Sequence, residues 1–460
     1  MIGDLTVRIP KQHGLLYMNN SFLLLLLIHI PFALLLKQIN LIATIHGWFI
    51  LLMGVFIAFT DPNGRRVAYI SAYIVGAEVL WRMTNADVFW EFSKYAISTI
   101  MLVYLLRIRQ FKSAGPPIFY FGLLLVSMPL TFNFLPLNLA RQAISFNLSG
   151  PLCLAVSVIF FSQITLDWQD WTKLSQYLVA PIIGIATIAM WQTISTEHIT
   201  FTSESNFITS GGFGPSQVSA ILSLGAFFLF LLATLQTSWY RRFLPLGGAL
   251  ALATLSALTF SRGGVYNLAA GLFVFLAFSI RNNRLRNTFI LLLFFGYIVG
   301  TYSIYPKLDE FTGGMLMKRF ADTQLTGRWE IMLSNLMVWQ QNPLLGAGPG
   351  MAVYMGYTMI GISAGAHTEY SRLLAEHGIL GLVALFLLII MALSALRKAP
   401  QGFSRALVAG ILTWVFVDMS HASMRISAIP FLFGLTNVVW SQQTQNFSNL
   451  VRKKYFPKDE

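Results

Sequence analysis

Cysteine, charge and recognisable metal-ligand patterns are scarce in this chain. Its 460 residues include one cysteine, Cys153, which excludes a disulfide framework and a thiolate metal site within the chain. The seven histidines are scattered, without a His-x-x-x-His or Asp-x-Asp pattern, so we expect no metal centre. The chain also lacks a Gly-rich loop that ends in Lys-Ser or Lys-Thr, and we expect neither ATP nor another cofactor.

Hydrophobic residues dominate instead. They make up 56% of the chain, only 11% of the residues are charged, and the mean hydropathy is +0.65. Soluble domains carry roughly 25% charged residues. Apolar runs recur at lengths close to the ~20 residues that cross a bilayer as a helix, so we predict an all-α, polytopic membrane bundle of about 12 to 14 helices. The predicted spans are 21–36, 43–60, 67–83, 94–106, 117–135, 147–166, 174–194, 214–235, 243–260, 264–280, 288–304, 378–396, 406–418 and 426–441.

Lysine and arginine indicate how this bundle lies in the membrane. Most of the 31 basic residues fall in the termini and in the loops of one side, whereas loops 84–93 and 195–213 of the other side have none. Because short cytoplasmic loops are enriched in Lys and Arg, we predict that both termini are cytoplasmic. The first apolar run has no small-residue cleavage site behind it and is predicted to be a retained helix. The net charge of +13 is then mainly a topology signal, and we expect no nucleic-acid partner.

The longest outer segment, residues 305–377, contains a predicted amphipathic helix. Thr326 suits an N-cap, Glu330 suits the first turn, and the apolar residues between 329 and 337 share one side. Arg328 then lies at the positive end of the helix, where a guanidinium and backbone N–H groups can bind a phosphate. The alternative is a helix that only anchors the loop at the membrane interface.

A second outer arginine lies in the sequence Ser-Arg-Gly-Gly, residues 261–264. The apolar run 243–280 is about twice as long as the hydrocarbon layer is thick, so these four residues are predicted to form a turn. Arg262 either extends to the membrane surface, as arginines at helix ends commonly do, or binds an anion over a water-filled cavity. In the second case the two glycines let the ligand approach the backbone.

Ionisable side chains also precede the span 378–396. Glu369, Arg372 and Glu376 have the spacing of a self-neutralising ladder on a helix surface. The imidazole of His367 suits proton transfer, although a single histidine in such a position is more often structural.

Charge within the predicted spans is rare. The clear pair, Glu78 and Arg82, has i,i+4 spacing and can neutralise itself on one helix face. Because carriers usually place ionisable residues at the bilayer midplane, this scarcity argues against transport.

The segment 367–381 resembles the signature of the O-antigen ligase and Wzy polymerase superfamily. That signature is a His, usually followed by Asn, Ser or Gln, then nine residues and Gly-x-x-Gly; this chain has His367, Thr368, nine residues and Gly378-x-x-Gly381. Thr368 departs from the usual choices. Three further stretches, 211–225, 261–264 and 326–350, are similar to the same family, and the resemblance covers roughly residues 130–390.

The resemblance implies a metal-independent, inverting glycosyltransferase of the GT-C type. Its substrates would be undecaprenyl-diphosphate-linked glycans at the periplasmic or outer face of the bacterial cytoplasmic membrane. It assigns catalytic roles to Arg262, Arg328 and His367. The weaker candidates for substrate contacts or for orienting the histidine are Arg141, Arg319, Arg372 and Glu369. The predicted regions are N-terminal transmembrane helices at 1–130, a catalytic region at 131–396 with its outer loop at 305–377, and C-terminal helices with a tail at 397–460.

Three activities remain open. A polymerase transfers the glycan to another lipid-linked repeat unit, a ligase transfers it to lipid A-core, and a flippase moves it without cleavage and does not need His367. Thr368, together with Ser-Arg-Gly-Gly and the Thr-Gly-Arg at 326–328, favours the polymerase. A chain-length regulator and a flippase are then the expected protein partners.

Overall fold

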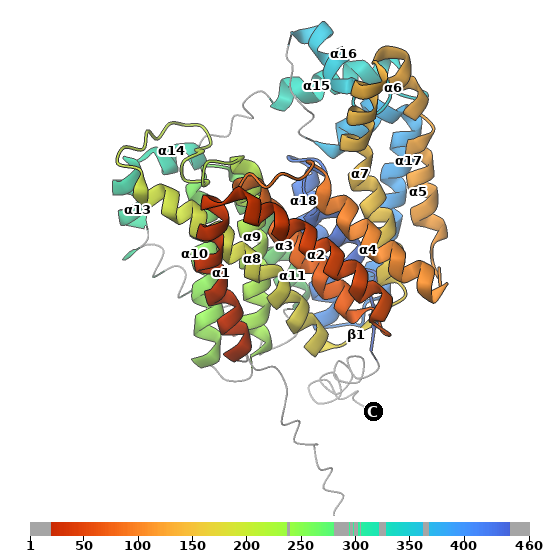
Figure 1. Ribbon diagram of the computed structural model, residues 1–460. Helices are drawn as coiled ribbons and strands as arrows, with labels where there is room; N and C mark the ends of the chain where they lie inside the picture. Colours follow the sequence, from red (N-terminus) through yellow and green to blue (C-terminus); the bar gives the residue numbers. More distant parts are fainter. Residues whose placement is uncertain are drawn as a thin grey trace, which may run out of the picture.

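The computed structural model describes residues 20–236, 240–279, 305–321, 328–361 and 368–441, with a few isolated residues between 294 and 303 (Figure 1). The described chain is a bundle of helices. Its first half contains α1 (Asn20–Gln38), α2 (Asn40–Thr60), α3 (Arg65–Met83), α4 (Phe92–Ile108), α5 (Gly115–Leu125), α6 (Met128–Phe134), α7 (Leu137–Phe161), α8 (Trp168–Ser195) and α9 (Pro215–Leu235).

The second half continues the bundle and adds short helices at one end. It contains α10 (Phe243–Leu258), α11 (Arg262–Ser279), α13 (Tyr305–Thr312), α14 (Met315–Ala321), α15 (Arg328–Gln341), α16 (Met351–Ile360), α17 (Glu369–Lys398), α18 (Phe403–Met419) and α19 (Ala428–Leu435). The 3-10 turn η1 (Tyr240–Arg242) precedes α10. A two-residue parallel pair, β1 (Thr165–Leu166) with β2 (Val439–Trp440), is the only sheet among the described residues.

The prediction of a polytopic helical membrane protein is confirmed. Within the described chain, seven helical segments are long and apolar enough to cross a membrane: α2, α5 with α6, α7, α8, α9, α11 and α17. The predicted break in the run 243–280 is present, but it lies at 259–261 and not at 261–264. Helix α10 ends at Leu258 and α11 begins at Arg262, so residues 262–264 are helical.

Two of the predicted spans, 288–304 and 426–441, do not correspond to a described membrane-spanning helix. The span at 288–304 lies outside the described residues, apart from isolated positions. The span at 426–441 contains only the eight-residue α19, which rises about 12 Å as a helix and is too short to cross ~30 Å of hydrocarbon. After it the chain turns into β2, which pairs with β1.

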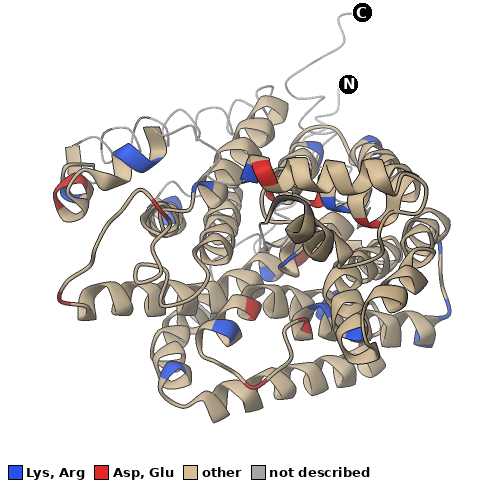
Figure 2. Cartoon of the chain, turned by 90° about the horizontal axis from the view of Figure 1, so that it is seen from above, with Lys and Arg blue, Asp and Glu red and all other residues tan. Residues whose placement is uncertain are grey.

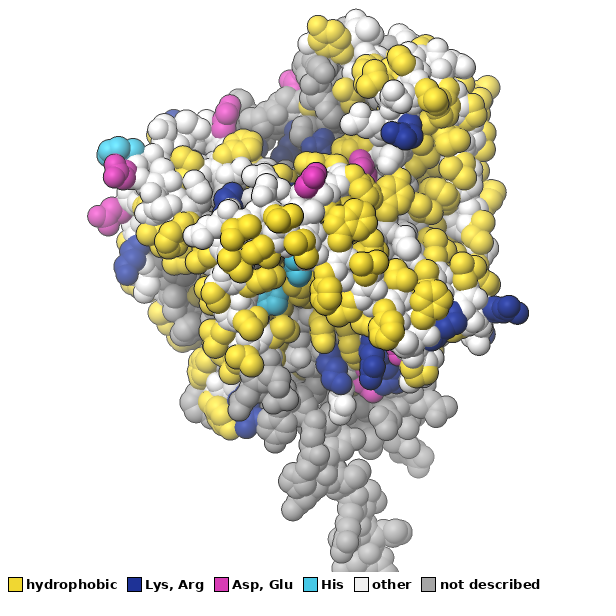
Figure 3. Space-filling model, viewed as in Figure 1, with side chains coloured by type: hydrophobic (Ala, Val, Ile, Leu, Met, Phe, Trp, Pro, Cys, Tyr) yellow, Lys and Arg dark blue, Asp and Glu magenta, His cyan; other side chains and the backbone are white. Residues whose placement is uncertain are grey.

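One hydrophobic core runs through the bundle from Phe22 to Trp440. Helix α3 packs against α8, α11 packs against both α9 and α18, and α19 packs against α7. Helices of the three predicted regions therefore share one core. The assignment of a catalytic role to the middle region stays a prediction. On the outside, large apolar side chains such as Leu52, Phe56 and Ile118 are exposed, and hydrophobic side chains cover much of the flank in Figure 3. An apolar flank of this kind suits contact with lipid tails.

The loop at the β1 end of the bundle is fixed by charge and by capping. Asp167 caps α8, since its Oδ1 accepts hydrogen bonds from the backbone N–H groups of Gln169 (2.8 Å) and Asp170 (2.9 Å), while Asp170 Oδ2 accepts from Asp167 N. Arg65 at the start of α3 forms ion pairs with both carboxylates.

The opposite end of the bundle gathers loops that are far apart in sequence. Asn206 N donates to Thr259 O at 2.9 Å, and Arg319 Nε donates to Phe260 O at 3.1 Å. The loop after α8, the turn between α10 and α11, and α14 therefore lie together. All three belong to the side that the charge pattern predicts to be outer.

The long helix α17 is interrupted at Gly378, which has φ +60° and ψ −136°. The interruption diverts Ile379 N to Pro343 O (2.8 Å) and leaves the carbonyls of Ala375 and Glu376 without helical partners. The backbone N–H groups of Ala347 and Gly348 fill these positions at 2.9 Å each.

The glycines of the Gly-x-x-Gly motif fit this junction. A Cβ at Gly378 would lie 2.6 Å from Gly346 N and from the backbone of Leu344, and a Cβ at Gly381 would lie 1.9 Å from Leu373 O. Gly378 therefore packs on the loop that follows α15, whereas Gly381 packs on the part of α17 that precedes the kink.

We predict that Gly378→Ala destabilises the protein, because a Cβ meets backbone atoms and the backbone angles are strained for any residue except glycine, by roughly 1–3 kcal/mol or more. Gly247→Ala is the matched control, since a Cβ there meets nothing within 4 Å. Thermal unfolding in detergent, followed by tryptophan fluorescence, compares the two. Equal midpoints for the two variants would contradict this account of the break.

Candidate functional site

Arg262 lies at the end of the bundle that the charge pattern predicts to be outer, called the outer end below. It is the first residue of α11, and only 8% of it is exposed. The turn that carries it is fixed to α9, because Ser219 Oγ donates to Ser261 O at 3.0 Å. Gly264 makes this approach possible, since a Cβ there would lie 2.3 Å from Ser219 O. The sequence of this turn therefore places Arg262 in a defined position over α9.

A polar cluster on the other side of the turn fixes it to α18. His421 Nε2 and Asn267 Oδ1 are 2.9 Å apart, and Asn267 Nδ2 donates to Asp418 Oδ1 at 2.6 Å. A Cβ at Gly263 would lie 2.4 Å from His421 Cε1. The interpretation that the two glycines leave room for a ligand is therefore wrong. Their space is taken by His421 and by α9.

Arg328 begins α15 and lies close to the start of α11. Burial, followed by the positive charges of Arg262 and Arg319, lowers the pKa of Arg328, while Tyr266 acts in the opposite direction. Arg262 and Tyr266 are one turn apart on α11, so Arg328 approaches that face. As predicted, Arg328 occupies the positive end of a helix that has Glu330 in its first turn. The predicted N-cap Thr326 lies outside the described residues.

Three of the seven predicted site residues thus come together. Arg262, Arg319 and Arg328 come from three helices, and each is mostly buried or half-buried. Positive charges repel one another more strongly in a protein interior than in water. A group of three arginines is therefore favourable mainly where an anion joins them, and guanidinium groups match phosphate geometry.

Helix α15 presents two different sides. Its inner side packs on α17 through Ile331 and Val338, and Asn335 Nδ2 donates to Ser371 Oγ at 3.0 Å. The predicted apolar side is exposed, including Trp329 and Leu333. An exposed apolar stripe on a helix at the end of a membrane bundle suits insertion into the lipid interface.

The histidine of the motif, His367, lies outside the described residues, and its catalytic role stays a prediction. Its neighbour Thr368 is the N-cap of α17, because Thr368 Oγ1 accepts a hydrogen bond from Ser371 N at 3.3 Å. Threonine, serine and asparagine all fill this position well. Thr368 thus departs from the usual motif but still caps the helix.

The charge ladder of α17 is buried, although the spacing predicts a surface ladder. Arg372 Nη2 contacts Glu369 Oε1 at 2.5 Å, and Arg372 Nη1 contacts Glu376 Oε2 at 2.6 Å. Arg372 also donates to Asn147 Oδ1 of α7. These contacts explain why the three charges tolerate burial. Whether Arg372 and Glu369 also contact substrate stays a prediction.

Arg141 and His377 lie apart from the arginine group. Arg141 is exposed on α7 and is not among the charges that act on Arg328, so its role also stays a prediction. His377 is buried, and its Nδ1 is 2.5 Å from Ser127 Oγ between α5 and α6. This second histidine of the segment therefore holds helices together.

Sequence reasoning missed two side chains of the outer end, His421 and Arg425. Burial and the charges of Arg328 and Arg372 lower the pKa of Arg425, which places it beside the arginine group. A signal was present, since Arg425 precedes the last predicted span in a short outer loop, where arginines are uncommon.

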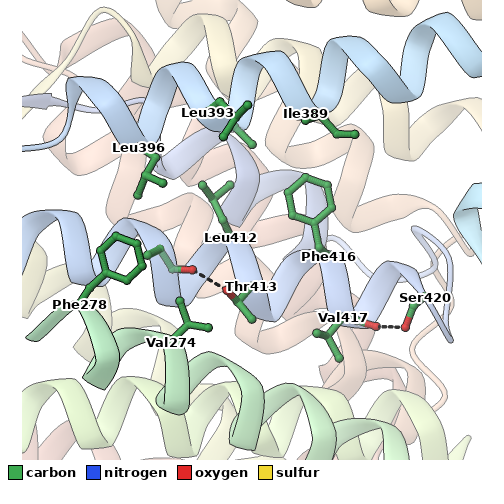
Figure 4. Close-up of a pocket in the computed structure, with 12 residues that line it drawn as sticks. Val274, Phe278, Ile389, Leu393, Leu396, Leu412, Thr413, Phe416, Val417 and Ser420 are labelled. Atoms are coloured by element: carbon green, nitrogen blue, oxygen red, sulfur yellow. Dashed lines mark hydrogen bonds between the residues drawn. The ribbon is translucent and has the colours of Figure 1, made fainter.

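An apolar groove runs down the bundle below this site. Its volume is about 510 Å³, and α11, α17 and α18 line it with side chains such as Val274, Leu393 and Phe416 (Figure 4). Leu393 is exposed, so the groove opens on the flank. Its last lining residue, Ser420, immediately precedes His421, which packs on the Arg262 turn.

The views of the whole molecule agree with this arrangement. Figure 3 shows a hollow at the upper end of the bundle, with Lys and Arg side chains visible inside it. Seen from above, most of the ribbon is uncharged, and the charged positions are few and scattered (Figure 2). Among the residues that the structure describes, no group of three or more His, Cys, Asp or Glu side chains is arranged to hold a metal ion.

Comparison with known protein families gives a match to part of the chain. Residues 247–386 match the family model described as O-antigen ligase. No curated protein matches the chain. The matched region contains Arg262, Arg319, Arg328 and the complete motif of residues 367–381. Such a domain implies lipid-linked glycan substrates and a membrane environment. The match thus supports an O-antigen ligase and Wzy polymerase-like family for this multi-pass membrane protein, whose residues 247–386 are similar to that family's model.

Proposed function

We propose that this protein transfers a glycan from undecaprenyl diphosphate to a hydroxyl of another lipid-linked repeat unit, at the outer face of the bacterial cytoplasmic membrane. The grouping of Arg262, Arg319 and Arg328 beside an apolar groove carries this proposal. A polyisoprenyl diphosphate joins a strongly anionic head to a long hydrocarbon tail. A site for it needs guanidinium groups next to an apolar surface, and both occur here.

The reaction exchanges two bonds at the anomeric carbon of the donor. The acceptor hydroxyl forms a new C–O bond there, and the bond to the diphosphate oxygen breaks, with inversion at that carbon. Negative charge grows on the departing undecaprenyl diphosphate, and Arg262 and Arg328 stabilise it. His367 accepts the proton of the acceptor hydroxyl. The resemblance implies that no metal ion takes part.

The tail of the donor would lie along the groove between α11, α17 and α18. The groove ends at Ser420, one residue before His421, and His421 packs on Gly263 beside Arg262. A diphosphate at the arginines therefore places the first isoprene units at the upper end of the groove. The apolar side chains that line the groove would then cover part of the tail in place of surrounding lipids.

Ligase activity is the second candidate, because the matched family is described as O-antigen ligase. The Ser-Arg-Gly-Gly and Thr-Gly-Arg sequences support the polymerase. Thr368 is weaker support for the polymerase than its departure from the usual motif indicates. It is an N-cap, and Thr, Ser and Asn can all serve in that position. The acceptor therefore has to be tested directly.

We predict that the purified protein in liposomes elongates undecaprenyl-diphosphate repeat units when no other acceptor is present. Gel separation of the lipid-linked products measures chain length, and we expect the same products with EDTA. Elongation that needs lipid A-core would identify a ligase. Repeat units that reach the other leaflet at unchanged length would identify a flippase.

We predict that the arginines and the histidine affect different kinetic constants. Arg262→Ala and Arg328→Ala each raise the donor KM about tenfold or more, since a charged hydrogen bond contributes about 1.5–3 kcal/mol. Arg→Lys stays impaired because lysine cannot make two parallel contacts. His367→Ala abolishes transfer and leaves donor binding unchanged.

Arg66→Ala is the control for these variants, since Arg66 is exposed at the opposite end of the bundle. Steady-state rates with purified donor give both constants. Full activity of His367→Ala would contradict the catalytic role of His367.

We predict that Thr368 acts through its capping hydrogen bond and does not choose the acceptor. Thr368→Ala then lowers the stability of the protein by about 1 kcal/mol, whereas Thr368→Asn retains it. Thermal unfolding and product analysis with both acceptors measure the two effects. A change of acceptor in Thr368→Asn would contradict the capping role.

A further inference from the structure

The segment 420–427 connects α18 to α19 and contacts the start of α11, where Arg262 lies. It lies outside residues 247–386, so the family match assigns nothing to it. At its start, His421 packs on Gly263 and pairs with Asn267 of α11. The segment is thus fixed to the turn that carries Arg262.

Two buried carboxylates hold the rest of this segment by its backbone. Glu369 Oε2 of α17 accepts a hydrogen bond from Met424 N at 3.3 Å. Glu78 Oε2 of α3 accepts from Ser427 N at 2.6 Å and from Ser427 Oγ at 2.8 Å. These two tethers lie one residue before and two residues after Arg425. Few backbone conformations satisfy both hydrogen bonds, so the direction in which the Arg425 side chain leaves the backbone is restricted.

Each carboxylate is also paired with its own arginine. Glu369 binds Arg372, and Glu78 Oε1 binds Arg82 Nη2 at 2.7 Å. Arg82 is in turn held by Gln217 Oε1 at 2.6 Å. A buried carboxylate without a cation would be costly, and here each carboxylate contacts a guanidinium as well as the backbone N–H group. The nearby Arg82 and Arg372 are therefore engaged in holding the carboxylates.

Arg425 adds a positive charge to the site from a third direction. It is half-buried, and the charges that act on it are those of Arg328 and Arg372. Arg262 and Arg319 act on Arg328 from α11 and α14, whereas Arg425 approaches from the segment after α18. Arg328 therefore interacts electrostatically with arginines from three other segments. A diphosphate presents oxygens on two phosphorus atoms and can engage guanidinium groups from several directions.

We propose that Arg425 binds the diphosphate of the lipid-linked donor, and that Glu78 and Glu369 are positioning residues that fix the backbone on either side of it. This inference rests on the proposed function. It adds to the site a residue from outside the matched domain, and it gives the buried charges of α3 a role in substrate binding.

The test uses farnesyl diphosphate as a short polyisoprenyl diphosphate and farnesyl monophosphate as its comparison. Binding to the purified full chain is measured by the change in tryptophan fluorescence. We expect Arg425→Ala to weaken binding of the diphosphate about tenfold or more and binding of the monophosphate less. Arg397→Ala, an exposed arginine at the opposite end of α17, is the matched control and should leave both unchanged.

A second pair of variants tests the positioning role. Glu78→Gln keeps an oxygen that accepts from Ser427 and should retain most of the diphosphate affinity, whereas Glu78→Ala should lose it. Thermal unfolding accompanies each measurement. If Arg425→Ala does not fold, Arg425→Gln replaces it. A folded Arg425 variant with wild-type affinity for the diphosphate overturns the inference.

Failure of the proposed function gives a different result. In that case the wild-type protein itself does not prefer the diphosphate to the monophosphate, and Arg262→Ala changes nothing. A third result is that the wild type binds the diphosphate, Arg262→Ala weakens this binding and Arg425→Ala does not. The donor assignment is then retained, and the role of Arg425 is rejected.

Discussion

The ion pairs of Arg372 hold the outer end of the bundle together. Two carboxylates of α17, Glu369 and Glu376, are buried only because one guanidinium lies between them. Through Asn147 the same guanidinium reaches α7, and through Met424 N one of the carboxylates reaches the segment after α18. Removal of this one charge would leave two uncompensated carboxylates in the interior. Contacts of this one side chain and its carboxylate partner thus connect α17 to α7 and to the segment after α18.

The fold class followed from composition and from the spacing of apolar runs, because both report how much of the chain must avoid water. The turn at Arg262 was also predictable, since no bilayer accommodates a helix from 243 to 280. The short α19 was not. The run 426–441 is apolar because it is buried in protein, and hydropathy alone does not distinguish burial in protein from burial in lipid.

The candidate site was predictable in part and for specific reasons. Arg262 and Arg328 lie in recognisable local sequences, and helix rules place Arg328 at a helix start. Arg425 has no such local signature, and its position depends on Glu78 and Glu369, which lie 347 and 56 residues away in the chain. The ladder of Glu369, Arg372 and Glu376 was recognised by spacing, but its burial depends on α7, which a single helix pattern does not reveal.

The groove between α11, α17 and α18 opens on the flank of the bundle, and under the proposed function this determines how the donor arrives. A donor that enters there diffuses in two dimensions, so its mole fraction in the bilayer, and not its bulk molarity, sets the rate of encounter. Detergent tails compete for the same surface. The apparent affinity measured in micelles then depends on detergent concentration, and lipid nanodiscs of fixed composition are the setting in which such constants can be compared.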